Sequence, residues 1–96
     1  MNNLAISSGH FILRAMGNLR RLEILYALWK QEKSVGELEK LVGLSQSALS
    51  QHLAVLRQAG VVKTRRQAQT IFYSIKSPVT SNILNILDKF YNQRYE

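Results

Sequence analysis

A chain of 96 residues, 46% of them hydrophobic, is long enough for one small domain with a modest core. Lysine and arginine number 13 against 6 aspartates and glutamates, and the formal net charge of +7 favours a polyanionic partner, either nucleic acid or an anionic membrane surface. Because the chain has no cysteine, a disulfide framework, a thiolate metal site and a thiol redox switch are excluded. No apolar run approaches the roughly 18 residues of a membrane-spanning helix, and the first residues lack the basic-then-apolar order of a signal peptide, so we expect a cytoplasmic protein that spans no membrane.

The first third of the chain predicts two helices. Apolar residues recur at helical spacing over 4–16, and Gly17 followed by Asn18 ends one helix and caps the next. The second helix is expected over 19–30, where the apolar set is too wide for a single exposed stripe, so this helix should be central. The polar residues 31–33 are expected to form a connection.

The next segment carries the end signals of two short helices. Ser34 and Glu37 have the spacing of a capping box, which opens a helix that ends at Gly43. Ser45 can cap the following helix, and Gly60 can close it in the left-handed conformation. Two helices joined by a glycine-containing turn, the second with a polar face, form the helix-turn-helix arrangement.

The helix over 45–60 has two unlike faces when its residues advance by about 100° each. The apolar face consists of Ala48, Leu49, His52, Leu53 and Leu56, and the polar face of Gln46, Ser47, Ser50, Gln51, Ala54, Arg57 and Gln58. The alternative is that the polar face is an ordinary solvated surface. Such a surface would mix glutamate with lysine, whereas this one has no acid. Hydroxyls and carboxamides can bond base edges without repelling phosphate. We therefore predict a DNA-recognition helix whose candidate contacts are Ser45, Gln46, Ser47, Ser50, Gln51 and His52.

Three of these candidates carry more specific expectations. Gln46 and Gln51 are candidates for adenine contacts, because a carboxamide can bond N6 and N7 together. His52 lies on the apolar face, where a half-buried histidine that braces the helix is favoured over a metal ligand. The only other histidine, His10, would give a weak two-histidine site without carboxylate or thiolate help.

After Gly60 the period changes to 2, which predicts two strands over 61–66 and 70–75. The link 67–69 contains no Gly, Asn or Asp, so its turn type is not predictable. The basic, polar tip of this hairpin suits a wing along the phosphate backbone, although charged residues also protect edge strands from aggregation. The candidate wing and backbone contacts are Arg57, Lys63, Arg65, Arg66, Gln67 and Gln69, with Arg20 and Arg21 as weaker candidates.

A last helix is expected over 79–93, with Pro78 at its start. It is strongly amphipathic, and so small a domain has little core left for it to cover. We therefore expect it to pair with the first helix and with a second copy of the chain. The candidate dimer contacts are Phe11, Leu13, Leu84, Leu87, Phe90 and Tyr91. The whole of 1–96 is thus predicted to be a single mainly α domain with one β-hairpin, a winged helix-turn-helix that dimerises through its first and last helices.

Three runs carry a family resemblance: Ser34-Val35-Gly36-Glu37-Leu38, Leu44-Ser45-Gln46-Ser47-Ala48-Leu49-Ser50-Gln51-His52-Leu53, and Leu56-Arg57-Gln58-Ala59-Gly60-Val61-Val62. Together they resemble the ArsR/SmtB family of winged-helix repressors. The run Gln69-Thr70-Ile71-Phe72-Tyr73-Ser74-Ile75 is most similar to the HlyU/BigR-like branch. The resemblance covers nearly the whole chain. It implies a homodimer that binds a near-palindromic operator, with the first and last helices at the dimer interface.

The resemblance also implies a sensing site, and this sequence departs from it there. Metal-sensing members use cysteines before the helix-turn-helix or Asp, His and Glu sets on the last helix, and the HlyU/BigR-like branch uses a cysteine pair. The corresponding neighbourhoods here read Leu25-Tyr26-Ala27 and Phe90-Tyr91-Asn92-Gln93, and the last helix offers Asp88 alone as a hard ligand. We therefore expect no metal and no cofactor, and the inducer is unknown.

These features predict a sequence-specific DNA-binding transcriptional regulator, most simply a repressor. The alternative is a protein-interaction module with the same fold, and binding to a membrane surface is a further rival. An enzyme is excluded, because the sequence shows no nucleophile–base pair, no paired carboxylates, no glycine-rich phosphate loop and no metal-ligand spacing.

Overall fold

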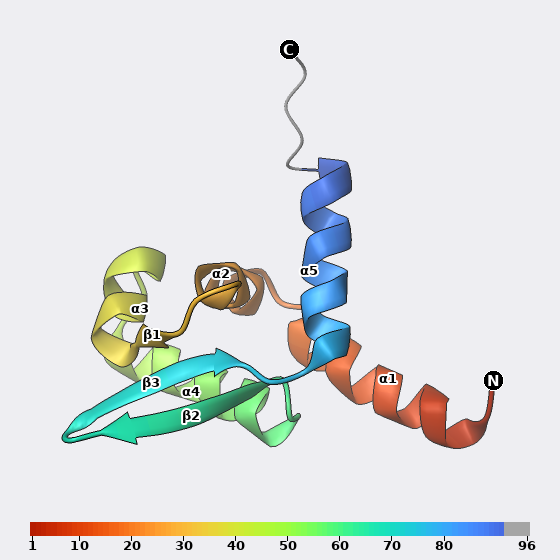
Figure 1. The fold of residues 1–96 in the computed structure, drawn as a ribbon, viewed down its shortest axis with the longest axis horizontal. Helices are drawn as coiled ribbons and strands as arrows, with labels where there is room; N and C mark the ends of the chain where they lie inside the picture. The colour runs from red at the N-terminus through yellow and green to blue at the C-terminus, as the bar shows by residue number, and fades with distance from the viewer. Residues whose placement is uncertain (92–96) are drawn as a thin grey trace, which may run out of the picture.

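The computed structural model describes residues 1–91, and its elements follow the predicted order with one addition. In chain order they are α1 (Asn3–Met16), α2 (Leu19–Leu28), β1 (Lys33–Ser34), α3 (Val35–Val42), α4 (Gln46–Gln58), β2 (Val62–Gln67), β3 (Thr70–Ile75) and α5 (Pro78–Tyr91). Figure 1 shows the β2–β3 hairpin extending to the left, α1 extending to the right and α5 rising upward. Positions 92 and 93 of the predicted last helix lie outside the described residues.

The ends of the helices confirm the predicted caps. The Ser34 hydroxyl accepts from the Glu37 backbone N–H, and the Glu37 carboxylate accepts from the Ser34 N–H, which completes the capping box. Gly43 ends α3 at φ 66°, and Gly60 follows α4 at φ 74°. The Ser45 hydroxyl caps α4 by accepting from the Ala48 N–H at 3.2 Å. These local signals fix the angle at which the chain enters α4.

The sheet has three strands in the order β1-β3-β2, and the predicted two-strand hairpin was therefore incomplete. Lys33 pairs with Tyr73 and Ser34 with Phe72, so part of the predicted polar connection 31–33 is a strand. A strand of two residues is too short to show a period in the sequence, and it exists because β3 offers it a free edge. This pairing ties the start of α3 to the middle of β3.

The hairpin turn is one residue shorter than the predicted link. Gln67 pairs with Thr70, which leaves Ala68 and Gln69 as the turn. Ala68 has φ 55°, a left-handed conformation that hairpins ordinarily give to Gly, Asn or Asp. The missing turn signal in the sequence thus corresponds to an alanine in an unfavourable backbone region.

The core lies between α2, α3, α4 and the base of the sheet. Ile24, Leu25 and Leu28 of α2 are almost completely buried, which confirms the central place predicted for this helix. The remaining buried apolar residues come from the other elements: Ala15, Met16, Leu38, Leu49, Leu53, Leu56, Val61, Val62 and Leu84. Each large buried side chain contributes about 1.5–3 kcal/mol relative to its exposed state.

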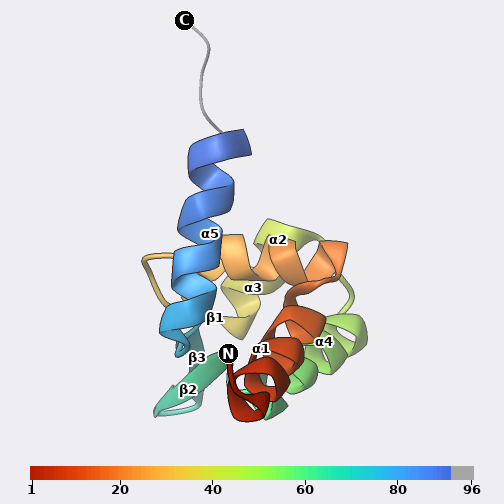
Figure 2. The ribbon, with the colours of Figure 1, turned by 90° about the vertical axis from the view of Figure 1, so that its right-hand side faces the viewer.

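Leu84 belongs to this core, and this corrects its assignment as a dimer contact. Its side chain is 0% exposed, because α5 packs it against its own chain. Leu87 is half-buried, whereas Phe11, Leu13, Phe90 and Tyr91 are exposed. Figure 2 shows the molecule with the N-terminal end of α1 nearest the viewer and α5 rising above the rest of the domain. No helix within residues 1–91 is long and apolar enough to cross a membrane.

Candidate nucleic-acid interface

The two faces predicted for α4 are confirmed. Each of the seven polar-face residues is exposed, and each of the five apolar-face residues is buried or half-buried. Leu49, Leu53 and Leu56 enter the core and hold the helix against the rest of the domain. The first turn of α4 has no acid, so the partial positive charge of its N-terminus is not offset there.

The exposed surface of α4 has two sides, one beside β3 and the other facing α1. On one side Ser50 and Arg57 line a shallow hollow of about 290 Å³ beside Tyr73 of β3. On the other side Val55 faces α1 across a second hollow, described below. Between these two sides the helix geometry leaves Ser47 and Gln51 directed outward, away from the buried leucines.

The remaining predicted contacts of this helix are placed at its start. Gln46 is exposed in the first turn, where a recognition helix contacts bases. Ser45 is also exposed, and its hydroxyl is the N-cap. A hydroxyl that accepts a capping bond still has its own proton to donate, so the cap and a phosphate contact are compatible.

All six residues predicted to contact DNA from the wing and the end of α4 are exposed. The β2–β3 register pairs Thr64 with Tyr73 and Arg66 with Ile71. Because side chains alternate along a strand, Arg66 lies on the same face as Tyr73, the face that packs toward α4. Lys63, Arg65 and Gln67 share the opposite face, and Gln69 lies in the turn.

Arg65 is engaged by its own chain. Its Nε donates to Glu32 Oε2 at 3.2 Å, its Nη2 to Glu32 Oε1 at 2.5 Å and its Nη1 to Gln67 Oε1 at 3.0 Å. The face of the guanidinium lies 4.6 Å from the centre of the Phe72 ring. The hydrogen bond from Arg65 lowers the pKa of Glu32 below its ordinary value.

The two weaker phosphate candidates, Arg20 and Arg21, both bond to other parts of the domain. Arg20 donates to the Val42 carbonyl at the end of α3 (2.7 Å) and pairs with Glu23 (2.8 Å). A cation that bonds the last carbonyls of a helix also complements its dipole. The Arg21 guanidinium donates to the carbonyls of Arg14 and Ala15 at the end of α1 and lies against His52 of α4. No local pattern in the sequence reports these partners.

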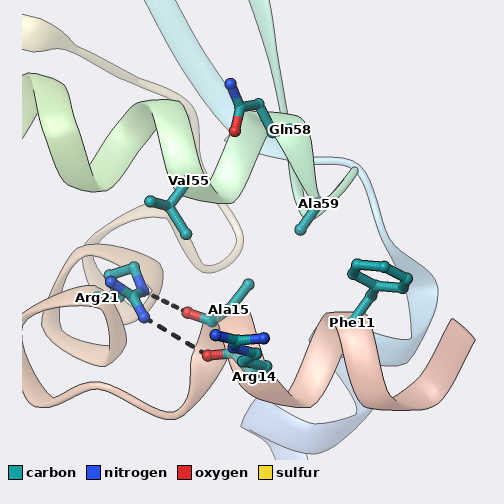
Figure 3. Close-up of a pocket in the computed structure, with 7 residues that line it drawn as sticks. All are labelled: Phe11, Arg14, Ala15, Arg21, Val55, Gln58 and Ala59. Atoms are coloured by element: carbon teal, nitrogen blue, oxygen red, sulfur yellow. Dashed lines mark hydrogen bonds between the residues drawn. The ribbon is translucent and has the colours of Figure 1, made fainter. Parts of the chain in front are cut away.

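His52 is half-buried and directed toward α2 rather than along the outward ridge. Its Nδ1 lies 3.4 Å from Nη1 of Arg21. Beside this contact is an open hollow of about 450 Å³, which Figure 3 shows between α1, Arg21 and the C-terminal half of α4. Phe11 and Arg14 line it from α1, and Val55 and Gln58 from α4.

Tyr26 occupies the position where the family resemblance implies a sulfur. Its hydroxyl donates to the Leu84 carbonyl at 3.4 Å, and its ring lies edge-on to Trp29. Burial, and secondarily the charge of Asp88, raises the pKa of this phenol. Tyr26 therefore joins α2 to α5 by a hydrogen bond. Among residues 1–91, no three His, Asp or Glu side chains are grouped so that they could hold a metal ion.

Comparisons with known proteins agree with this arrangement. Residues 18–64 match the family model of the bacterial regulatory proteins of the arsR family. The chain is 51% identical over 82 residues to the transcriptional activator HlyU of Vibrio cholerae, an alignment that covers 85% of this chain and 76% of HlyU. It is 54% identical over 79 residues to the nodulation protein NolR of Rhizobium meliloti, which covers 82% of this chain but only 65% of NolR. A solved structure of HlyU from Vibrio cholerae superposes with a TM-score of 0.90 at 46% identity, over 97% of this chain and 100% of that one.

Proposed function

The chain belongs to the arsR family of bacterial regulatory proteins, and we propose that it represses transcription by binding a near-palindromic operator as a homodimer. It is a DNA-binding transcriptional regulator and not an enzyme. We propose that it acts in the cytoplasm, where bacterial DNA lies. Residues 1–96 are proposed to form a single domain that both binds DNA and dimerises.

One observation supports the role of α4 above others: its exposed face is free of acids, with Ser47 and Gln51 directed outward. In the proposed complex the two α4 helices enter successive major grooves, about 34–36 Å apart along the duplex. Gln46 and Gln51 bond base edges, and Ser45, Ser47 and Ser50 bond phosphates or share bases. Arg57, Lys63, Arg66 and the wing tip add phosphate contacts, which carry no sequence information by themselves.

The proposed dimer rests on the apolar side chains that α1 and α5 leave exposed. On α5 they form a stripe at helical spacing, Val79, Ile83, Ile86 and Phe90, in which Ile83 is half-buried. Phe11 and Leu13 add apolar surface on α1, with exposures of 64% and 57%. Exposed apolar side chains of this number on a small chain mark an interface. Val79 and Ile86 are additions to the predicted contacts, and their spacing from Phe90 was available in the sequence.

The proposal is tested by locating an operator and then perturbing α4. Genome-wide footprinting of the bound protein supplies the operator, and fluorescence anisotropy on that duplex gives the affinity. Gln51→Ala should cost about 1–3 kcal/mol on the best operator and relax the preference at one base pair of each half-site. Gln58→Ala is the matched control, because it removes the same group two turns later, beyond the part of the helix that reads bases.

Two outcomes contradict the proposal. If the protein retains none of the genomic DNA fragments at low ionic strength, operator binding by this chain is excluded. An equal loss for Gln51→Ala on every sequence excludes a base-reading role for that residue. Sedimentation of the protein with operator duplex measures the stoichiometry, which should be two chains per palindrome, and a promoter–reporter fusion separates repression from activation.

A further inference from the structure

Arg21 belongs to α2, and its side chain contacts two other helices, α1 and α4. It lies in the first turns of α2, where its backbone N–H donates to the side chain of Asn18, the α2 cap. Its Nε donates to the Ala15 carbonyl at 2.5 Å and its Nη2 to the Arg14 carbonyl at 3.5 Å, both in the last turn of α1. Its Nη1 lies 3.4 Å from Nδ1 of His52 in the middle of α4. Figure 3 shows the two bonds to α1 beside the hollow.

The α1 end of this connection has a clear physical basis. The last four carbonyls of a helix have no partner within the helix, and they carry its negative dipole end. Gly17 N–H satisfies the carbonyl of Leu13, and the Arg21 guanidinium satisfies the next two. Arg21 thereby fixes the last turn of the helix that carries Phe11 and Leu13.

The α4 end of the connection determines the state of His52. A guanidinium has donors and no acceptor, so a hydrogen bond at this contact requires Nδ1 of His52 to accept, with the ring proton on Nε2. His52 follows Gln51 directly, and it lies on the side of α4 turned toward α1 and α2. A movement of α4 at His52 therefore also moves Gln51, which faces outward.

We propose that Arg21 is a positioning residue that sets the orientation of α4 relative to α1 through His52, and that His52 acts inward on Arg21 rather than on DNA. This inference rests on the proposed function, in which α1 contributes to the dimer and α4 reads the operator. The dimer axis is then connected to each recognition helix through one guanidinium. Because an operator has a fixed half-site spacing, a change in that orientation weakens binding to both half-sites together.

Two substitutions of His52 separate an inward from an outward role. The carboxamide of asparagine can place an acceptor where Nδ1 lies, whereas the longer side chain of glutamine places its polar group near Nε2. His52→Asn should keep operator affinity within about threefold of the wild type, and His52→Gln should lose tenfold or more, about 1.4 kcal/mol. Arg21→Gln should lose a similar factor, and Arg21→Gln combined with His52→Gln should be no weaker than either alone, since both remove the same connection.

A spectroscopic readout on the free protein tests the contact without DNA. Long-range ¹H–¹⁵N spectra should show His52 as the Nε2–H tautomer, and Arg21→Gln should change that signature. Thermal unfolding of each variant separates loss of fold from loss of positioning, since His52→Asn and His52→Gln should unfold within a few degrees of each other.

The outcomes are distinguishable. Affinity retained by His52→Gln and lost by His52→Asn, or a His52 protonated on Nδ1 alone, overturns the inward role. If Gln51→Ala weakens binding while all His52 and Arg21 variants bind as the wild type does, only the positioning role is overturned. If Gln51→Ala also binds as the wild type does, α4 is not the recognition helix, and the positioning role falls with the proposed function.

Discussion

Arg65 and Glu32 form a two-point ion pair, Nε to Oε2 and Nη2 to Oε1, that ties the hairpin to the segment before β1. Both side chains are partly exposed, and solvent screens their attraction, so the pair contributes little to stability. The pair bears on the proposed DNA contact of Arg65, because Glu32 accepts the hydrogen bonds that the guanidinium would otherwise donate to a phosphate.

Glu32→Gln should therefore raise affinity for DNA. Removal of the competing carboxylate frees Arg65 for a phosphate, and the plot of log affinity against log salt should steepen by up to about 0.9. Glu39→Gln is the control, since it removes the same charge from α3 without freeing an arginine of the wing. Equal effects of the two substitutions on the salt slope would show that only net charge matters, and Arg65 would then be a strut rather than a DNA contact.

Substitutions on the exposed and the buried face of α5 should affect different properties, dimer affinity and fold stability respectively. Phe90 is 62% exposed, so Phe90→Glu should leave the fold intact and raise the dimer dissociation constant by at least tenfold. Asn85→Glu adds the same charge on the exposed polar side of the helix and should leave the dimer unchanged. Leu84→Ala should instead destabilise the fold by about 2–5 kcal/mol, because it leaves a cavity in the core. Analytical ultracentrifugation and urea unfolding measure the two quantities, and a monomeric wild-type chain at micromolar concentration would contradict the proposed interface.

Ala68→Gly should stabilise the protein. Ala68 has φ 55°, where a Cβ costs about 1–2 kcal/mol, and the greater chain entropy of glycine offsets part of the gain. The net expectation is about 0.5–1 kcal/mol, or a rise in Tm of a few degrees for a domain of this size. Gly60→Ala is the reverse test: a Cβ there meets nothing within 4 Å, so its destabilisation reports backbone strain alone at φ 74°. A lower Tm for Ala68→Gly would mean that the turn does not hold Ala68 in this conformation.

The charge of Glu37 should stabilise the folded protein at neutral pH and lose this effect in acid. The bonds from the backbone and hydroxyl of Ser34 lower the pKa of Glu37 in the folded protein. A carboxyl whose pKa is lower when folded contributes fully above its unfolded pKa, about 4.3, and loses that contribution as the pH falls through the folded value. The wild type should therefore exceed Glu37→Gln in urea resistance at pH 7, and the difference should shrink toward pH 3. A difference that stays constant over this range would assign the effect to packing rather than charge.

Local chemistry explains which features the sequence predicts well. Ser34 with Glu37, Gly43 and Ser45 act on neighbours within a few residues, so the spacing alone predicts two helices and the turn between them. The faces of α4 follow for the same reason, since its period decides which side chains share a side.

Features that depend on distant partners could not be predicted. Arg21 meets His52, 31 positions along the chain, and Arg65 meets Glu32, 33 positions away. Basic residues beside a helix-turn-helix suggested phosphate contacts, and nothing local showed that these guanidinium groups are held by the chain itself. The amphipathic pattern of α5 likewise shows that Leu84 is on an apolar side, but not whether its own core or a second copy covers it.

Through the proposed dimer, the apolar stripe on α5 would make the folding of this regulator depend on its concentration in the cell. If two chains bury those side chains in each other, mass action makes unfolding concentration-dependent, and each tenfold dilution below the dissociation constant favours the lone chain. A cell with few copies would then hold a population less able to occupy its operator and more readily degraded. Duplex DNA would counter this by drawing chains into pairs, so regulator lifetime and promoter occupancy would rise and fall together.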